Sequence, residues 1–159
     1  MKVQAAIAAA LLLPFSLPTH ASEVTSEQRG CFTSEAVALD RAGEVVIGHS
    51  EVRGVTDSVP PGAIWDKTTH HCRSVWTSSK AGYEFSNRCT NVDRDGDKFF
   101  TMASGSSLKS FKWVYIGGTG KYAGISGGGD ASIEAVYPRA TPTVGGACWR
   151  GKGSYTLKN

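Results

Sequence analysis

The chain has 159 residues, of which 17 are Lys or Arg and 14 are Asp or Glu, giving a formal net charge of +3 at pH 7. The basic residues are scattered rather than clustered, which argues against a nucleic-acid-binding protein. Hydrophobic residues make up 40% of the sequence, enough for the core of one domain, and no shift in composition indicates a second domain.

The N-terminal segment 1–21 has the pattern of a secretory signal peptide. Lys2 provides a positive start, residues 3–13 form an apolar run, and small residues precede the expected cleavage after Ala21. A membrane anchor is the alternative, but a spanning helix needs about 20 apolar residues. We therefore expect an exported protein, periplasmic or secreted, without a stable membrane anchor, whose single mature domain covers 22–159.

Cysteine usage agrees with export. The chain has four cysteines, Cys31, Cys72, Cys89 and Cys148, which is an even number. In an exported chain this predicts two disulfides. A zinc site is the alternative, but no two cysteines have the close spacing of zinc ligands, and adjacent residues such as His70 and His71 point to opposite faces of a strand.

Downstream of the signal peptide the pattern is that of an all-β protein. Residues 34–41 ("SEAVALDR") are compatible with two helical turns. Beyond them, short alternating segments are separated by Gly, Pro, Asn and Asp. Loops are predicted around 55–61 and 138–146, and the predicted strands cover 45–53, 72–78, 83–92, 98–103, 111–117, 131–137 and 149–157.

One hairpin register can be derived in detail. A two-residue turn at Lys80-Ala81 places Trp76 opposite Phe85 and Cys72 opposite Cys89. Both pairs then occupy non-hydrogen-bonded positions, where the α-carbons approach to about 4.5 Å, close enough for a disulfide. Cys31 and Cys148 remain to pair with each other. Because the turn residues are not of the favoured Asn-Gly type, a longer loop with a bulge is the alternative.

The stretch "NVDRDGDKFF" partly matches the pattern of a calcium-binding loop. Asp93, Asp95 and Asp97 have the initial spacing of an EF-hand, but Lys98 and Ser104 stand where that motif needs Gly and Glu. A hairpin turn with Asp95-Gly96 at its tip is the prediction that the residues favour.

The stretch "YIGGTGKYAGISGGG" partly matches the glycine patterns of nucleotide-binding loops. A dinucleotide fingerprint needs a helix behind it, and the glycines from Gly124 to Gly129 disfavour one. A P-loop would need Gly at Tyr115 and Ser or Thr at Tyr122. The glycines are therefore expected to serve turns, bulges and bends of the backbone, and no cofactor is expected.

The same glycines carry a resemblance. "GGTGKYAGISGGG" resembles the G-G-[TS]-G-x-[FY]-x-G-x-x-G element of the allene oxide cyclase and dirigent-like barrels. "DRDGDKFF", "FKWVYIGGTG" and "CWRGKGSYTLK" also resemble segments of small exported bacterial proteins of that superfamily, and the similarity covers most of 72–158. It implies a closed, calycin-like antiparallel β-barrel of about eight strands. The element's structural glycines are Gly117, Gly118, Gly120, Gly124 and Gly127.

The resemblance implies no catalytic residue. Dirigent proteins steer phenoxy-radical coupling and allene oxide cyclases cyclise a fatty-acid epoxide, but their functional residues lie outside the glycine element, at positions that cannot be matched to this chain. Of the titratable strand residues, His49, Glu51 and Glu134 form no nucleophile–base set and are expected to be solvated. Whether the protein is an enzyme stays open, and no metal is expected.

Strand alternation places large aromatic residues inside the barrel, where they either fill the core or line a pocket. The residues expected to line a ligand site are Trp76, Phe85, Asn87, Trp113 and Tyr155. Asn87 is the expected polar contact, because a buried amide needs a partner. Three functions follow: a binding barrel for a small apolar or aromatic ligand, a cyclase- or isomerase-like enzyme using the same cavity, or a protein-interaction or inhibitor module acting through its loops.

Overall fold

The structure, a computed structural model, describes residues 22–107 and 109–158. The predicted signal peptide lies outside the described residues. The elements are β1 (Val24–Ala42), β2 (Val45–Val59), β3 (Thr68–Ser79), β4 (Gly82–Val92), β5 (Lys98–Gly105), β6 (Ser110–Gly118), the short 3-10 helix η1 (Gly120–Tyr122), β7 (Ser126–Tyr137) and β8 (Val144–Thr156).

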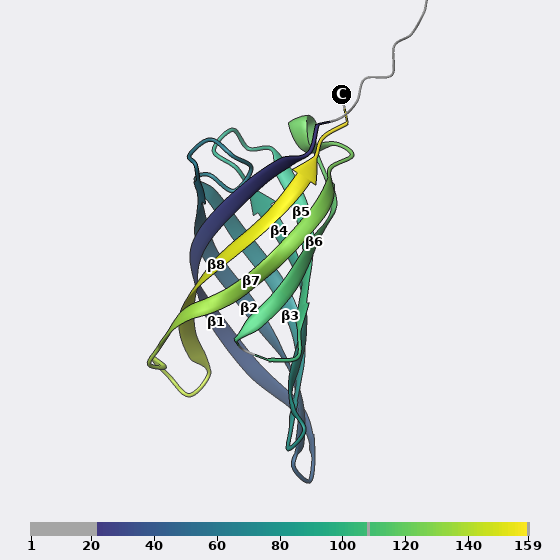
Figure 1. Cartoon of the computed structure of the whole chain (residues 1–159). Coiled ribbons are helices and arrows are strands. Elements are labelled where there is room, and N and C mark those ends of the chain that lie inside the picture. The colour runs from purple at the N-terminus through teal and green to yellow at the C-terminus, as the bar shows by residue number, and fades with distance from the viewer. Residues whose placement is uncertain (1–21, 108, 159) are drawn as a thin grey trace, which may run out of the picture.

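The strands form a closed antiparallel barrel in the order β1 to β8, with β1 pairing with both β2 and β8 (Figure 1). The expected fold class is therefore confirmed. The β2–β3, β4–β5 and β6–β7 loops lie at one end, the upper one in Figure 1, together with η1. The β1–β2, β3–β4, β5–β6 and β7–β8 turns lie at the opposite, lower end.

The helical prediction for 34–41 is wrong, because these residues belong to β1. Phe32 and Ser34 line the interior, whereas Val37 is exposed. The Glu, Ala and Leu residues of this segment favour helix, but pairing with β2, and with β8 at Ser34 and Glu35, overrides that propensity.

Two loop predictions were too long. Residues 55–59 continue β2 and pair with β1, and 144–146 open β8, so the true loops begin at Pro60 and end before Val144. Strands β3 and β7 also begin several residues earlier than the sequence predicted. Barrel closure explains the extensions, since every strand gains two neighbours and its backbone groups pair further along its length.

The predicted β3–β4 hairpin register is confirmed. Ser79 faces Gly82 across the turn, Trp76 faces Phe85, and Cys72 faces Cys89. The predicted disulfides are both present: Cys72–Cys89 and Cys31–Cys148 each join residues whose α-carbons lie 4.0 Å apart. The second bond ties the first strand to the last across the closing seam of the barrel.

The upper half of the barrel is filled by a hydrophobic core. Phe99 is fully buried, and Trp113 packs against β7 and β8. A β-carbon on Gly129 or Gly153 would lie 2.8 or 2.7 Å from the ring of Trp113. These two glycines thus provide the space that the indole ring occupies.

The glycine element of the sequence forms the β6–β7 connection. It contains η1, a 3-10 turn rather than the α-helix that a nucleotide fingerprint needs, and strand β7 follows. Positive φ angles occur at Gly117 (144°), Gly120 (52°), Gly124 (74°) and Gly127 (120°), whereas Gly118 lacks one.

The aspartate-rich stretch forms the β4–β5 turn, as predicted, with Gly96 at a φ of 88°. One carboxylate oxygen of Asp93 accepts the backbone N–H groups of Asp95 (2.9 Å) and Asp97 (3.0 Å). The ammonium group of Lys121 lies 2.6 Å from carboxylate oxygens of Asp93 and Asp95. The turn is therefore held by its own hydrogen bonds and by this lysine; in the described part of the chain no group of three His, Cys, Asp or Glu side chains is arranged to hold a metal ion.

Candidate functional site

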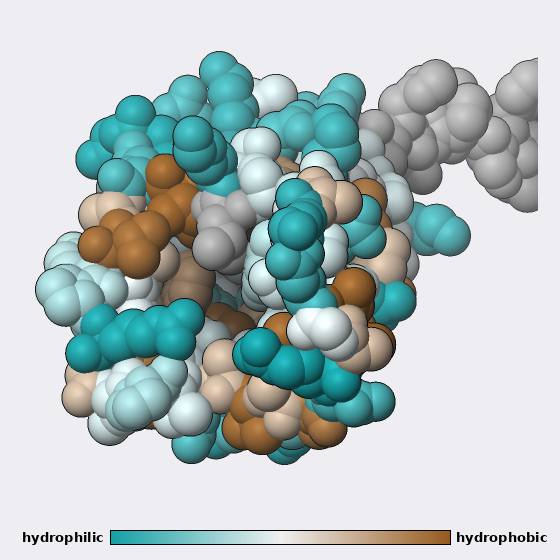
Figure 2. Space-filling view, turned by 90° about the horizontal axis from the view of Figure 1, so that it is seen from below, coloured by the Kyte–Doolittle hydropathy of each residue, from teal (hydrophilic) through white to brown (hydrophobic). Residues whose placement is uncertain are grey.

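The lower half of the barrel is hollow. A cavity of about 670 Å3 is enclosed by inward side chains of the strands and opens at the end formed by the β-hairpin turns. Figure 2 looks onto this end and shows a hollow near the middle of the face, with apolar side chains in it and both hydrophilic and apolar side chains around it. The alternation of side chains along each strand therefore builds a concave site as well as a core.

Trp65 closes the cavity at its inner end. This residue belongs to the β2–β3 loop but is buried inside the barrel. Its ring makes edge-to-face contacts with Phe99 (4.8 Å between centroids), Trp113 (5.5 Å) and Trp149 (5.9 Å). The indole N–H donates a 3.0 Å hydrogen bond to the hydroxyl group of Tyr115. Trp65 thus separates the filled half of the barrel from the hollow half.

Aromatic rings form much of the cavity wall. Trp76 stacks on Tyr83 with 6.2 Å between ring centroids, and Phe85 contacts Phe111 edge-to-face at 6.0 Å. All four residues line the cavity. Such a wall offers both faces and edges of rings, which suits flat or unsaturated ligands.

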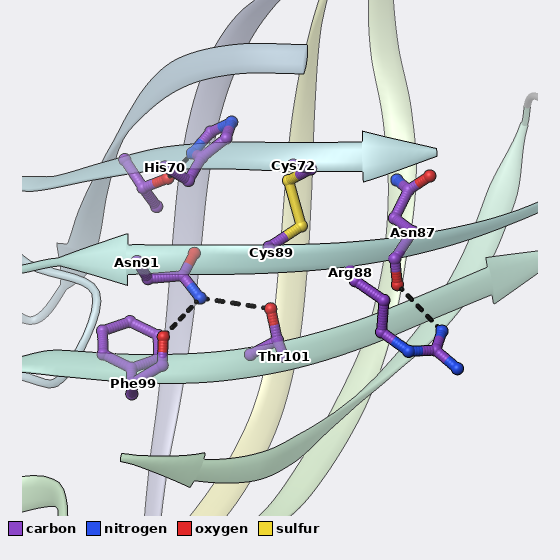
Figure 3. The surroundings of a disulfide bond; sticks show 9 residues. His70, Cys72, Asn87, Arg88, Cys89, Asn91, Phe99 and Thr101 are labelled. Atoms are coloured by element: carbon purple, nitrogen blue, oxygen red, sulfur yellow. Dashed lines mark hydrogen bonds between the residues drawn. A yellow bond between two sulfur atoms is a disulfide. The ribbon is translucent and has the colours of Figure 1, made fainter. Parts of the chain in front are cut away.

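The Cys72–Cys89 disulfide is part of the same wall, between β3 and β4 (Figure 3). Its position follows from the hairpin register, because both cysteines share the inner face with Trp76 and Phe85. The bond therefore fixes the two strands next to the cavity.

His70 is a titratable group at the inner end of the cavity. Its ring nitrogen Nδ1 lies 3.3 Å from the hydroxyl oxygen of Thr56, and its side chain is buried. Burial lowers the pKa of His70 to about 4. The imidazole is therefore neutral at neutral pH, so that one ring nitrogen donates and the other accepts a hydrogen bond.

Several polar atoms of the wall have no hydrogen-bond partner within the described protein. They are the side-chain oxygen of Asn87 and the indole N–H groups of Trp76 and Trp113. Asn91, in contrast, donates hydrogen bonds to the carbonyl oxygen of Phe99 (3.0 Å) and to the hydroxyl oxygen of Thr101 (3.2 Å) (Figure 3). The side-chain oxygen of Asn87 and the two indole N–H groups are thus buried polar atoms of the wall that the described protein leaves without a hydrogen bond.

No carboxylate is present among the described residues of the cavity wall. Apart from tyrosines, the titratable side chains of the wall are His70 and Arg139, the latter from the β7–β8 loop. Acid–base chemistry by a pair of carboxylates therefore has no basis in the described wall, which offers imidazole, amide, hydroxyl and phenol groups instead.

The structure brings together four of the five residues that the sequence proposed for a ligand site. Trp76, Phe85, Asn87 and Trp113 line the cavity. Tyr155 does not; it packs at the closed end, 6.3 Å from the ring of Tyr115.

The other titratable candidates of the sequence lie outside the cavity. Glu51 is on the outer face, where it accepts a 2.6 Å hydrogen bond from His71, and Glu134 pairs with Arg150 at 3.0 Å. His49 also points outward, since its neighbour Ser50 lines the cavity.

Sequence reasoning missed Trp65 and His70. Trp65 lies in a loop, so no strand periodicity indicated its burial. His70 stands two positions before Cys72, and the alternation that placed Cys72 inside also places His70 there. Strand alternation could therefore have predicted from the sequence that His70 points into the barrel.

Comparison with known proteins gives a likeness of fold. No protein-family model and no curated protein matches the chain. Among solved structures, the pterocarpan synthase dirigent protein GePTS1 superimposes with a TM-score of 0.52 at 15% sequence identity, over 94% of this chain and 100% of that one. At this identity the likeness concerns the fold, and the closed barrel has the same kind of architecture. The chain therefore has a dirigent-like β-barrel fold.

Proposed function

We propose that the protein binds a small apolar or aromatic molecule inside the barrel. The observation that carries this proposal is the cavity of about 670 Å3, open at one end of the barrel, with an aromatic wall. Small-molecule sites typically have volumes of about 300–1,000 Å3 and are mostly apolar, with a few polar groups that orient the ligand.

The polar groups of the cavity suit hydrogen bonds that orient a ligand rather than ion pairs with a charged one. Neutral His70 at the inner end and Asn87 on the wall of β4 offer hydrogen bonds at two depths. An apolar ligand with one hydroxyl, carbonyl or similar group satisfies one of them while its carbon skeleton contacts the rings.

We also propose that the protein acts outside the cytoplasm. The two disulfides fit an oxidising compartment, and the N-terminal sequence has the pattern of a signal peptide.

An enzyme using the same cavity is the second candidate. The observation that favours it is the neutral imidazole of His70 at the inner end, which can take up or release a proton from a bound molecule. A protein-interaction module is less favoured, because it does not need a hollow barrel.

A pair of substitutions on β3 tests the binding proposal. Ser74 lines the cavity, whereas its neighbour Val75 is 60% exposed on the outer face. Ser74→Phe is expected to fill part of the cavity and to abolish the fluorescence enhancement of 1-anilinonaphthalene-8-sulfonate, an aromatic probe with one sulfonate group, while Val75→Phe leaves it unchanged. Displacement of the probe by a fatty acid or a phenol then compares ligand classes. Equal binding by both variants would place the probe outside the barrel and contradict the proposal.

A further inference from the structure

We infer that the open end of the barrel docks on a membrane surface with anionic headgroups. The further idea that the cavity takes up its ligand there rests on the proposed function, but the docking itself does not. Three features of the open end carry the inference: a basic residue in or next to every hairpin turn, exposed apolar side chains beside these residues, and the cavity mouth between the turns.

A basic residue lies in or next to each of the four turns at this end: Arg41 near the end of β1, and Lys80, Lys109 and Arg139 in the other three turns. All of them are exposed. Within the described residues of these loops (39–45, 79–82, 105–110 and 137–144) the acidic residues are Asp40 and Glu44. Glu44 pairs with Lys80 at 2.9 Å, so a positive excess remains at the open end.

The closed end has a different charge. Its β4–β5 turn contains Asp93, Asp95 and Asp97 against two cations, Arg94 of the turn and Lys121 of η1, which pairs with Asp93 and Asp95. The β2–β3 loop balances Asp66 with Lys67. An anionic surface is therefore attracted more strongly by the open end, which sets the orientation of the barrel.

Exposed apolar side chains accompany the cations. At the end of β7, Val136 is 74% and Tyr137 is 54% exposed, and Leu39 near the tip of β1 is 62% exposed. The β1–β2 hairpin also exposes Val37, Val45 and Ile47. Apolar and basic side chains on one face match the interfacial zone of a bilayer, where the former enter the acyl boundary and the latter contact headgroups.

The open end also holds its shape. The Lys80–Glu44 ion pair joins the tips of the β1–β2 and β3–β4 hairpins, which extend beyond the other loops (Figure 1). The backbone N–H of Ala36 donates a 2.9 Å hydrogen bond to the carbonyl oxygen of Thr143, which fixes the β7–β8 loop to β1. The cavity mouth lies between these loops, so a docked barrel opens toward the lipid, the phase in which an apolar ligand concentrates.

Vesicle flotation with the mature protein tests the inference. We expect binding to phosphatidylcholine vesicles that contain about 30% phosphatidylglycerol to be at least about tenfold tighter than to phosphatidylcholine alone, and to weaken as salt rises from about 0.1 M to about 0.5 M. Arg41→Glu with Lys109→Glu is expected to reduce binding to the anionic vesicles by about tenfold or more. Leu39→Asp is expected to weaken binding to both kinds of vesicle.

The matched control reverses two charges at the closed end, Arg94→Glu with Lys98→Glu, and is expected to leave vesicle binding within about twofold of the wild type. Equal binding to neutral and anionic vesicles, no binding to either, or an equal loss in the closed-end variant would overturn the inference. So would a dimer, seen by analytical ultracentrifugation, that Leu39→Asp dissociates, because the open end would then face a second copy.

Titration of the same variants with 1-anilinonaphthalene-8-sulfonate, without vesicles, separates the two proposals. Probe binding without vesicle binding contradicts the docking alone. Vesicle binding without probe binding leaves the docking in place and contradicts the ligand-binding function.

Discussion

The indole N–H of Trp65 donates a 3.0 Å hydrogen bond to the hydroxyl of Tyr115, a residue fifty positions later in the chain. This bond joins the β2–β3 loop to the inner face of β6. Burial raises the pKa of Tyr115 well above its ordinary value, so the bond is accepted by a neutral phenol. The boundary between the filled and the hollow half of the barrel depends on this contact.

Trp65→Ala is expected to destabilise the fold by about 3–5 kcal/mol, as truncation of a buried Trp usually does. Tyr115→Phe keeps the ring and removes only the acceptor of the indole N–H, for an expected loss of about 1–3 kcal/mol. Urea denaturation of both variants measures the difference. A loss for Trp65→Ala no larger than that for Tyr115→Phe would show that the packing of the indole ring contributes little.

His70 is expected to make stability depend on pH. Burial lowers the pKa of His70 from 6.5 to about 4 in the folded protein, so between these values the unfolded chain binds more protons at this residue. The contribution of His70 is therefore complete above pH 6.5 and is lost as the pH falls toward 4. The loss amounts to about 3 kcal/mol at most.

His70→Gln serves as the comparison, because carboxylates also titrate near the lower limit of this range. The difference in unfolding free energy between the two proteins is expected to shrink as the pH falls from 6.5 to 4. An NMR titration of the His70 ring protons provides a direct check. A midpoint near 6.5 would mean that the imidazole is hydrated rather than desolvated in the folded state.

The two disulfides are expected to differ in their contribution to stability. Cys31–Cys148 closes a sequence separation of 117 residues and Cys72–Cys89 one of 17. The chain-entropy model predicts a loss of about 4–5 kcal/mol on removing the first and about 3 kcal/mol on removing the second. Paired Cys→Ser variants, unfolded in urea under non-reducing conditions, test this order.

The two bonds should also differ in access. Cys31 is exposed on the outer face, whereas Cys72 is buried in the cavity wall. Partial reduction of the native protein with glutathione, followed by alkylation and peptide mapping, should therefore label Cys31 and Cys148 first. Earlier labelling of Cys72 would indicate that the cavity admits the reductant readily.

Gly118 is expected to be intolerant of a side chain. A β-carbon there would lie 2.5 Å from the carbonyl oxygen of Tyr122 and 2.9 Å from that of Lys98. Gly118→Ala should cost about 1–3 kcal/mol, since backbone atoms on both sides must shift. At Gly145, where the nearest atom would be the Cγ of Arg139 at 3.6 Å, substitution by Ala is the matched control and should be nearly neutral. Thermal unfolding compares the two; equal midpoints would contradict the steric explanation.

Local patterns in the sequence determined how strands that follow one another in the chain pair with each other. The alternation of Trp76 with its neighbours and the spacing of Cys72 and Cys89 led to the hairpin register, which is confirmed. The pairing of Cys31 with Cys148 followed, because an even number of cysteines in a chain with two disulfides leaves one choice once the first pair is assigned.

Only the tertiary structure decided which segment became β1 and where the barrel is hollow. Residues 34–41 have helix-forming composition, and their pairing with β2 makes them strand. Ser34 and Glu35 also pair with β8, more than a hundred positions away. Trp65 has no periodic neighbours to predict its burial, yet its ring closes the inner end of the cavity. The volume of the cavity depends on how side chains from all parts of the chain pack in three dimensions. No local pattern in the sequence reports that packing.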